Sequence, residues 1–234
     1  MRESQDNQFS VNDAESFRVM NKTEVINQIK GVGLVPVVRA SSSREAIAVI
    51  EAIKEGGVTI VEITMTVPNA IDVIKETSQK FGEDVLVGAG TVLDAETGRA
   101  CILAGAQFVV SPALSLKTIE MCRRYSIAVL PGALTPTEVV TAWEAGADMV
   151  KVFPCSAMGG ASYLKALKAP LPQVELIPTG GVSLSTAEEF IKSGASALGV
   201  GSDLVDLKAI RNNESEKVTE TARKYLEIVR EARK

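Results

Sequence analysis

Short apolar runs and stretches of helical period alternate eight times along most of this 234-residue chain. The apolar runs are rich in Val, Ile and Leu and alternate little with polar residues, which is typical of a parallel sheet covered on both faces. Eight strand–helix units predict an α/β fold, a closed (β/α)8 TIM barrel. The expected strands cover residues 34–40, 58–65, 85–90, 107–111, 127–133, 148–153, 174–181 and 196–201. The expected helices cover residues 43–56, 69–81, 95–105, 116–125, 135–146, 161–169, 185–194 and 213–234.

A recurring glycine supports this repeat. Gly56, Gly105, Gly146 and Gly194 each stand where an expected helix ends and the next strand begins, about two units apart, and glycine suits a helix C-terminus. The alternative is an open, doubly wound sheet. Its early GxGxxG turn is missing, because Gly199-Val-Gly201 comes too late in the chain and lacks a third glycine.

The expected domain organisation is simple. Residues 1–21 form a polar N-terminal extension, and residues 21–30 form a short amphipathic helix ended by Gly31. Residues 22–234 form a single (β/α)8 domain, and the barrel carries this helical extension before it and an amphipathic helix after it. The apolar stripe of that last helix consists of Val218, Ala222, Leu226 and Val229.

Composition excludes several classes of function. A net charge of −4 and a pI near 5.2 argue against nucleic-acid or anionic-membrane partners, and no apolar run is long enough to span a bilayer. Three cysteines without metal or redox spacing favour the cytoplasm. The chain has no histidine, so histidine general bases, histidine metal ligands and Ser-His-Asp triads are excluded. Proton transfer must fall to carboxylates, lysine, tyrosine, water or substrate.

Lys151 stands inside the apolar run 148–153. A lysine held among apolar residues can act as a nucleophilic amine. Alternatively, it lies near a strand end and extends its ammonium to solvent.

Glu62 is the second charged residue inside an apolar run, and strand alternation places it on the same face as Thr64. In a small barrel that face is the interior. Glu62 either forms a structural ion pair with Lys151 or Arg39, or acts as the acid/base partner of a nucleophilic lysine.

The remaining strand ends supply candidate binding residues, because barrel sites form at the C-terminal ends of the strands. Loops after the last two strands often bind phosphate through backbone N–H groups. The candidates are Arg39, Thr64, Thr66, Thr91, Ser111, Pro112 and Phe153 for substrate, and Thr179, Gly180, Gly181, Gly201 and Ser202 for phosphate.

An ordered set of motifs covering residues 22–233 resembles the 2-keto-3-deoxy-6-phosphogluconate aldolase family. The motifs are VEIT (61–64), GAGTVL (88–93), PG-x-x-TPTE (131–138), KVFP (151–154), PTGGV (178–182) and GVGS (199–202). The resemblance implies a metal-free class I aldolase, a homotrimer without cofactors. It implies Lys151 as the Schiff-base residue and Glu62 as the general acid/base. Thr91 and the Ser111-Pro112 turn would lie against the pyruvyl portion, and the late glycine loops would hold the phosphate.

One residue departs from the family pattern. Many members have an arginine four residues after the catalytic glutamate, where this chain has Thr66; Arg39 is the candidate replacement. The expected substrate is 2-keto-3-deoxy-6-phosphogluconate, cleaved to pyruvate and glyceraldehyde 3-phosphate, with 4-hydroxy-2-oxoglutarate as a possible second substrate. The galactonate epimer is the alternative.

Two other readings remain open from sequence. One is a different phosphate-binding barrel enzyme of the thiamine-phosphate synthase type, which needs no lysine nucleophile. The other is a non-catalytic barrel that binds a sugar phosphate.

Overall fold

The structure, a computed structural model, describes residues 20–234, so the expected extension over residues 1–21 falls almost wholly outside the described residues. The first helix, α1 (Lys22–Val32), begins at a capping box in which the Asn21 and Glu24 side chains each accept a hydrogen bond from the other's backbone N–H. It ends at Gly33, whose left-handed φ is 69°. The helix expected at residues 21–30 is confirmed and extends two residues further.

In the described part of the chain, nine strands alternate with the helices. The strands are β1 (Leu34–Val38), β2 (Ile60–Thr64), β3 (Leu86–Gly90), β4 (Phe108–Val110), β5 (Ala128–Leu130), β6 (Gly132–Ala133), β7 (Val150–Val152), β8 (Leu176–Pro178) and β9 (Leu198–Val200). The helices after α1 are α2 (Ser43–Glu55), α3 (Ala70–Phe81), α4 (Ala95–Leu103), α5 (Leu116–Arg124), α6 (Pro136–Glu144), α7 (Ala161–Lys168), α8 (Ala187–Lys192), α9 (Leu207–Arg211) and α10 (Glu216–Ala232). Each of the eight expected strand regions contains strand, whereas α9 and two short 3-10 helices, η1 (Gly82–Asp84) and η2 (Cys155–Met158), were not predicted.

The strands form two parallel sheets. One has the order β5-β4-β3-β2-β1-β9 and the other the order β6-β7-β8. They part at Pro131, which separates β5 from β6 and has no N–H to give to a ladder. The single strand expected over residues 127–133 is therefore wrong, and that run forms two strands.

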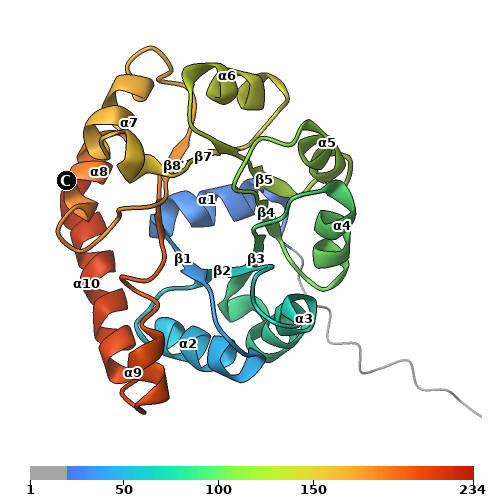
Figure 1. The fold of residues 1–234 in the computed structure, drawn as a ribbon, viewed down its shortest axis with the longest axis vertical. Helices are drawn as coiled ribbons and strands as arrows, with labels where there is room; N and C mark the ends of the chain where they lie inside the picture. Colours follow the sequence, from blue (N-terminus) through green and yellow to red (C-terminus); the bar gives the residue numbers. More distant parts are fainter. Residues whose placement is uncertain (1–19) are drawn as a thin grey trace, which may run out of the picture.

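The sheets are also close at their other ends, where two isolated parallel bridges join Leu176 to Ala195 and Thr179 to Gly199. The strands lie in the middle of the molecule with helices α2 to α10 around them, and α1 crosses the centre of the view (Figure 1). The architecture is thus an α/β fold in which a six-stranded parallel sheet is continued by a three-stranded one.

Two apolar clusters stabilise this arrangement. The larger one fills the space between the strands and the surrounding helices. The smaller one gathers inward-facing residues such as Ile60, Phe108 and Met149 with Val25 and Ile29 of α1. Full burial of a Val, Ile, Phe or Met side chain stabilises the fold by about 1.5–3 kcal/mol. Helix α1 therefore closes the end of the strands that lies opposite their C-terminal ends.

The repeated glycines have the conformation that helix ends require at three of the four predicted positions. Gly105, Gly146 and Gly194 have φ values of 111°, 90° and 96°, which disfavour any residue with a side chain. In the first repeat the prediction is displaced by one residue, because Gly56 is right-handed and Gly57 has a φ of 90°.

The C-terminal helix α10 packs on α2 and α8 through one face. Val218, Ala222 and Val229 are buried as the helical period predicts, but Leu226 is only partly buried. The fully buried residue at this level is Tyr225, with 0% exposure.

Candidate active site

Lys151 is the middle residue of β7, paired with Gly132 on β6 and Ile177 on β8. Its side chain is only 5% exposed, so the interpretation that it extends to solvent is wrong. Its ammonium lies 5.5 Å from the centre of the Phe153 ring, two residues along the same face. Among the described residues its one hydrogen-bond partner is Glu62.

Glu62 is the middle residue of β2, with a side chain 3% exposed. Its Oε1 lies 3.5 Å from Lys151 Nζ, at the long limit of a hydrogen bond. Gly90 on the neighbouring β3 makes room for it, since a Cβ at Gly90 would lie 2.0 Å from that oxygen. The structure therefore pairs Glu62 with Lys151 and not with Arg39, the other partner considered. This long, buried contact holds a carboxylate beside a lysine without fixing either group strongly.

Thr64 and Thr66 lie at the end of β2. The Thr64 hydroxyl donates to the Val38 carbonyl at 3.1 Å and lies 2.7 Å from the Thr66 hydroxyl. Thr64 is fully buried and Thr66 is exposed. They form a neutral, polar path from the Glu62 face to the surface.

Thr91 follows β3 in a left-handed conformation with a φ of 56°. Such a conformation is strained for a β-branched residue and is frequent at functional sites. At the end of β4, the Ser111 hydroxyl donates to the Ala113 carbonyl and accepts a long 3.4 Å contact from the Gly132 N–H. The Pro112 carbonyl also lies against Gly132, where a Cβ would be 2.4 Å from its oxygen. Both turns are thus packed at the C-terminal ends of the strands, as predicted.

The expected phosphate residues line one hollow of about 380 Å³ between the ends of β8, β9 and β1. Gly180 and Gly181 have φ values of 88° and 77°, so the backbone there turns without a side chain. Arg39 has no ion-pair or hydrogen-bond partner among the described residues, and its guanidinium is 4.0 Å from where a Cβ of Gly201 would lie. The hollow brings together the following predicted residues: Arg39, Phe153, Thr179, Gly180, Gly181, Gly201 and Ser202.

Two residues that line this hollow were not predicted from the sequence. Asp203 borders the hollow directly after Ser202, and Ser183 borders it after the glycine pair. Both lie close to predicted phosphate-binding residues, and this position could have indicated them. Asp203 was hard to predict, because a negatively charged residue is not expected beside a loop that binds phosphate. Lys151, Glu62, Thr64, Thr66, Thr91 and the Ser111-Pro112 turn do not line this hollow, and Phe153 links it to Lys151.

The comparison with known protein families decides the identification. A model described as KDPG and KHG aldolase matches residues 25–221, which is most of the chain. The chain belongs to the KDPG and KHG aldolase family.

Individual aldolases of this family agree. A 2-dehydro-3-deoxy-phosphogluconate aldolase of Treponema pallidum is 32% identical over 205 residues, which is 88% of this chain and 97% of that protein. A 2-dehydro-3-deoxy-6-phosphogalactonate aldolase of Escherichia coli is 37% identical over 172 residues, 73% of this chain and 83% of that protein. The KDPG aldolase of Legionella pneumophila, solved with pyruvate captured as a covalent carbinolamine, aligns with a TM-score of 0.80 at 30% identity and covers 86% of this chain and 98% of that one.

The three cysteines of this aldolase are buried thiols. Burial raises the pKa of Cys155 to about 11, although this residue follows the Lys151 motif directly. A thiol with so high a pKa is a poor nucleophile at neutral pH. Across residues 20–234 no group of three His, Cys, Asp or Glu side chains could hold a metal ion, and no helix there could span a membrane.

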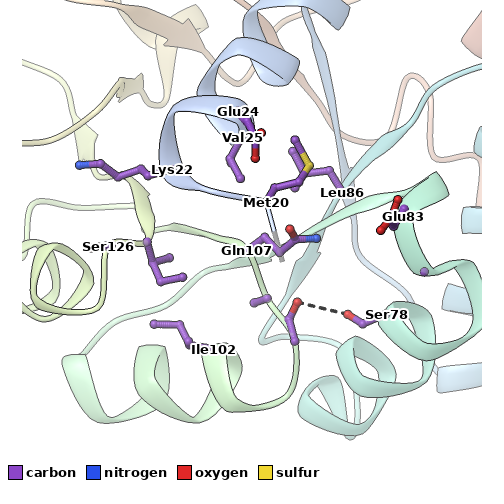
Figure 2. Close-up of a pocket in the computed structure, with 14 residues that line it drawn as sticks. Met20, Lys22, Glu24, Val25, Ser78, Glu83, Leu86, Ile102, Gln107 and Ser126 are labelled. Atoms are coloured by element: carbon purple, nitrogen blue, oxygen red, sulfur yellow. Dashed lines mark hydrogen bonds between the residues drawn. The ribbon is translucent and has the colours of Figure 1, made fainter. Parts of the chain in front are cut away.

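A second cavity of this aldolase, of about 400 Å³, lies at the other end of the strands. Figure 2 shows Met20, Val25 and Leu86 over it, with Gln107 pointing into its centre. Its walls are largely apolar and include none of the predicted site residues. Of these two cavities, the one at the C-terminal strand ends is therefore the one that predicted site residues line.

Proposed function

We propose that this protein is a class I aldolase that cleaves 2-keto-3-deoxy-6-phosphogluconate to pyruvate and glyceraldehyde 3-phosphate through a Schiff base on Lys151. The observation that carries the proposal is the buried amine of Lys151 with the Glu62 carboxylate 3.5 Å away. A nucleophilic amine beside a proton-relay group is what imine chemistry requires. Family membership supports the reaction class, and the buried contact between the two side chains supports these roles for Lys151 and Glu62.

The reaction begins when Glu62 takes a proton from the Lys151 ammonium, and the freed amine attacks the C2 ketone. A proton passes from the nitrogen to the C2 oxygen and completes a neutral carbinolamine. Glu62 then gives its proton to the departing hydroxyl, and water leaves as the protonated imine forms. The protonated imine withdraws electrons from C3. Glu62 next takes the proton of the C4 hydroxyl, the C3–C4 bond breaks, and its electron pair enters the enamine as the aldehyde departs.

The enamine then accepts at C3 the proton that Glu62 took from the C4 hydroxyl. Water adds to C2 of the resulting protonated imine as Glu62 takes one of its protons. Collapse of the new carbinolamine releases pyruvate and the Lys151 amine, to which Glu62 returns that proton. Lys151 is the one hydrogen-bond partner of the Glu62 side chain among the described residues, so no other contact there competes for its carboxylate. Every proton removed is returned, so the cycle balances without a metal or an organic cofactor.

The substrate's two ends would be held by different parts of the molecule. The pyruvyl portion lies beside Thr91 and the Ser111-Pro112 turn, near Lys151. The phosphate would lie in the hollow at Gly180, Gly181, Gly201 and Ser202, where its charge is compensated by backbone N–H groups and by Arg39, which has no partner among residues 20–234. Phe153, which borders both places, would separate them.

We extend the proposal to the architecture and assembly. The two sheets would form one closed (β/α)8 barrel over residues 22–234, supported by the continuous chain at Pro131 and the bridges between β8 and β9. A homotrimer and a cytoplasmic location remain expectations from the family resemblance and the cysteine content.

A second substrate has a specific observation in its favour. The galactonate-type relative is 37% identical, and Thr66 of this chain offers a neutral hydroxyl where many family members have an arginine. The two substrates differ at C4, the carbon whose hydroxyl Glu62 would deprotonate. Kinetic constants measured side by side on both epimers and on 4-hydroxy-2-oxoglutarate decide between them.

The lysine assignment is tested by trapping. Pyruvate with borohydride should give a stable adduct on a peptide containing Lys151, detected by mass spectrometry. An adduct on Lys165 or Lys168, or none, would overturn the assignment. Release of pyruvate, followed with lactate dehydrogenase, separates an aldolase from a barrel that only binds sugar phosphates.

A further inference from the structure

Two glycine loops line the phosphate hollow, residues 180–186 after β8 and residues 201–205 after β9. Few backbone hydrogen bonds join one loop to the other. The other neighbouring strands in each sheet share continuous ladders, but β8 and β9 meet only at two isolated bridges. Beyond the bridge at Thr179 and Gly199, no backbone hydrogen bond in the described part of the chain joins residues 180–186 to residues 201–205. Something else must set the distance between these loops.

Asp203 makes that link. Its Oδ2 accepts a hydrogen bond from the Leu184 N–H at 3.2 Å, across to the loop after β8. The same oxygen accepts a hydrogen bond from the Tyr225 hydroxyl at 2.5 Å. Asp203 itself follows Ser202 on the loop after β9 and borders the hollow. One carboxylate oxygen therefore joins both loops to a third element, α10.

Tyr225 is a rigid anchor for this carboxylate. Its side chain is 0% exposed, and α10 is further held to α2 by a 2.9 Å hydrogen bond from the Thr219 hydroxyl to the Ala52 carbonyl. Burial, together with the hydrogen bond to Asp203 and the charge of Asp203, raises the pKa of Tyr225, so its hydroxyl stays a donor at any pH at which the enzyme works. A buried tyrosine hydroxyl also needs a partner, and Asp203 supplies it.

We propose that Tyr225, acting through Asp203, is a positioning residue that sets the two glycine loops for the phosphate of the substrate. The inference rests on the proposed function, because it concerns the phosphate end of that same site.

The same contact explains an acidic residue beside an anion site. A free carboxylate at Asp203 would repel phosphate, and its oxygens can only accept hydrogen bonds. The Tyr225 hydroxyl and the Leu184 N–H hold Oδ2 toward donors and away from the substrate. Loss of the tyrosine hydroxyl should therefore loosen the loops and free a negative charge beside the phosphate, while Lys151 and Glu62 are untouched.

The experiment compares two substrates that differ only in the phosphate, 2-keto-3-deoxy-6-phosphogluconate and 2-keto-3-deoxygluconate. In Tyr225→Phe, KM for the phosphorylated acid should rise about tenfold, the size expected for one hydrogen bond to a charged group. The kcat for both acids and the KM for the unphosphorylated acid should stay within about twofold. Tyr163→Phe is the matched control, since it also removes one tyrosine hydroxyl, which donates to the Leu134 carbonyl outside both loops.

Asp203→Ala is the second variant, because it removes the link from the surface side and leaves the buried ring in place. It should also raise KM for the phosphorylated acid, but less than Tyr225→Phe does, because the loops lose their link while the negative charge beside the phosphate is removed as well. Equal rises for both acids, or no rise in either variant, would overturn the inference. Its failure is separable from that of the proposed function, which fails if the unmodified protein traps no pyruvate on Lys151 or shows no preference for the phosphorylated acid.

Discussion

Two lysine–glutamate pairs occupy opposite ends of the strands in this molecule. At the N-terminal end of the strands, Lys30 of α1 pairs with Glu175, which also accepts a hydrogen bond from the Ser196 hydroxyl at 2.5 Å. These side chains are 43% and 30% exposed. At the other end, Lys151 and Glu62 are 5% and 3% exposed, are 3.5 Å apart, and have no further hydrogen-bond partners among the described residues.

We propose that this difference separates a structural pair from a reactive one. The Lys30–Glu175 pair, called here the outer pair, is partly exposed to solvent, accepts a further hydrogen bond from Ser196, and joins α1 to the residue preceding β8. The Lys151–Glu62 pair, called here the inner pair, carries the desolvation cost of two buried charges. It lacks the extra hydrogen bonds that usually offset this cost. An arrangement so poorly satisfied persists where it serves function, and it leaves both groups free to exchange protons and bond to a substrate.

The largest effect that this comparison predicts is at Lys151. Lys151→Arg keeps the positive charge beside Glu62, but a guanidinium does not form an imine. Turnover should fall by about ten-thousandfold or more, as for loss of a covalent nucleophile. Pyruvate–borohydride trapping should vanish, and the circular dichroism spectrum should not change. Lys30→Arg is the matched change at the outer pair and should retain turnover; substantial activity in Lys151→Arg would remove the Schiff base from the mechanism.

The carboxylates give the next largest effect. Glu62→Gln keeps the shape but cannot relay protons, so kcat should fall by about a hundredfold or more. Glu175→Gln makes the same chemical change at the outer pair, and its kcat should equal that of the unmodified enzyme. If both variants lose turnover equally, or neither does, the two pairs are not functionally different and Glu62 is a structural ion pair.

The free energy of unfolding should depend more on the outer pair than on the inner pair, the reverse of the order expected for turnover. Replacing both members of the inner pair, in Lys151→Met with Glu62→Gln, removes two buried charges together, a change that is often neutral or stabilising by about 1–4 kcal/mol. The free energy of unfolding, from urea denaturation, should therefore rise or stay the same. The corresponding double change at Lys30 and Glu175 should lower it by up to about 1 kcal/mol. A clear loss of stability in the inner double variant would mean that this pair holds the fold together.

The sequence carried much of this arrangement. The strand–helix alternation and the charged residues inside apolar runs pointed to parallel strands with Lys151 and Glu62 facing inward. Strand parity decided which face each residue takes, but it left open whether Glu62 meets Lys151 or Arg39. That choice depends on the stagger between strands far apart in sequence, and no local pattern encodes it.

Other misses have similar physical causes. Pro131 ends a ladder although its neighbours are apolar, since the missing N–H matters only once the partner strand is known. Helical period marked Leu226 as buried on α10, but the helix is rotated so that Tyr225 faces inward and reaches Asp203, 22 residues away along the chain. Such a polar contact between a loop and a distant helix leaves no trace in hydrophobic periodicity.

The smallest predicted effect is an acid sensitivity at the outer pair. Burial by itself raises the pKa of Glu175, but the hydrogen bonds from Lys30 and Ser196 and the nearby positive charges outweigh it and lower that pKa below the usual 4.5. A carboxylate with a lowered pKa in the folded state contributes stability above its unfolded-state pKa, and that contribution is lost as the pH falls below it. Unfolding free energies measured between pH 7 and pH 3 should therefore fall less steeply in Glu175→Gln, with the difference from the unmodified protein, less than about 1 kcal/mol, present at pH 7 and fading below about pH 4.5. A difference that persists unchanged at pH 3 would show that the carboxylate's charge does not stabilise the contact between α1 and β8.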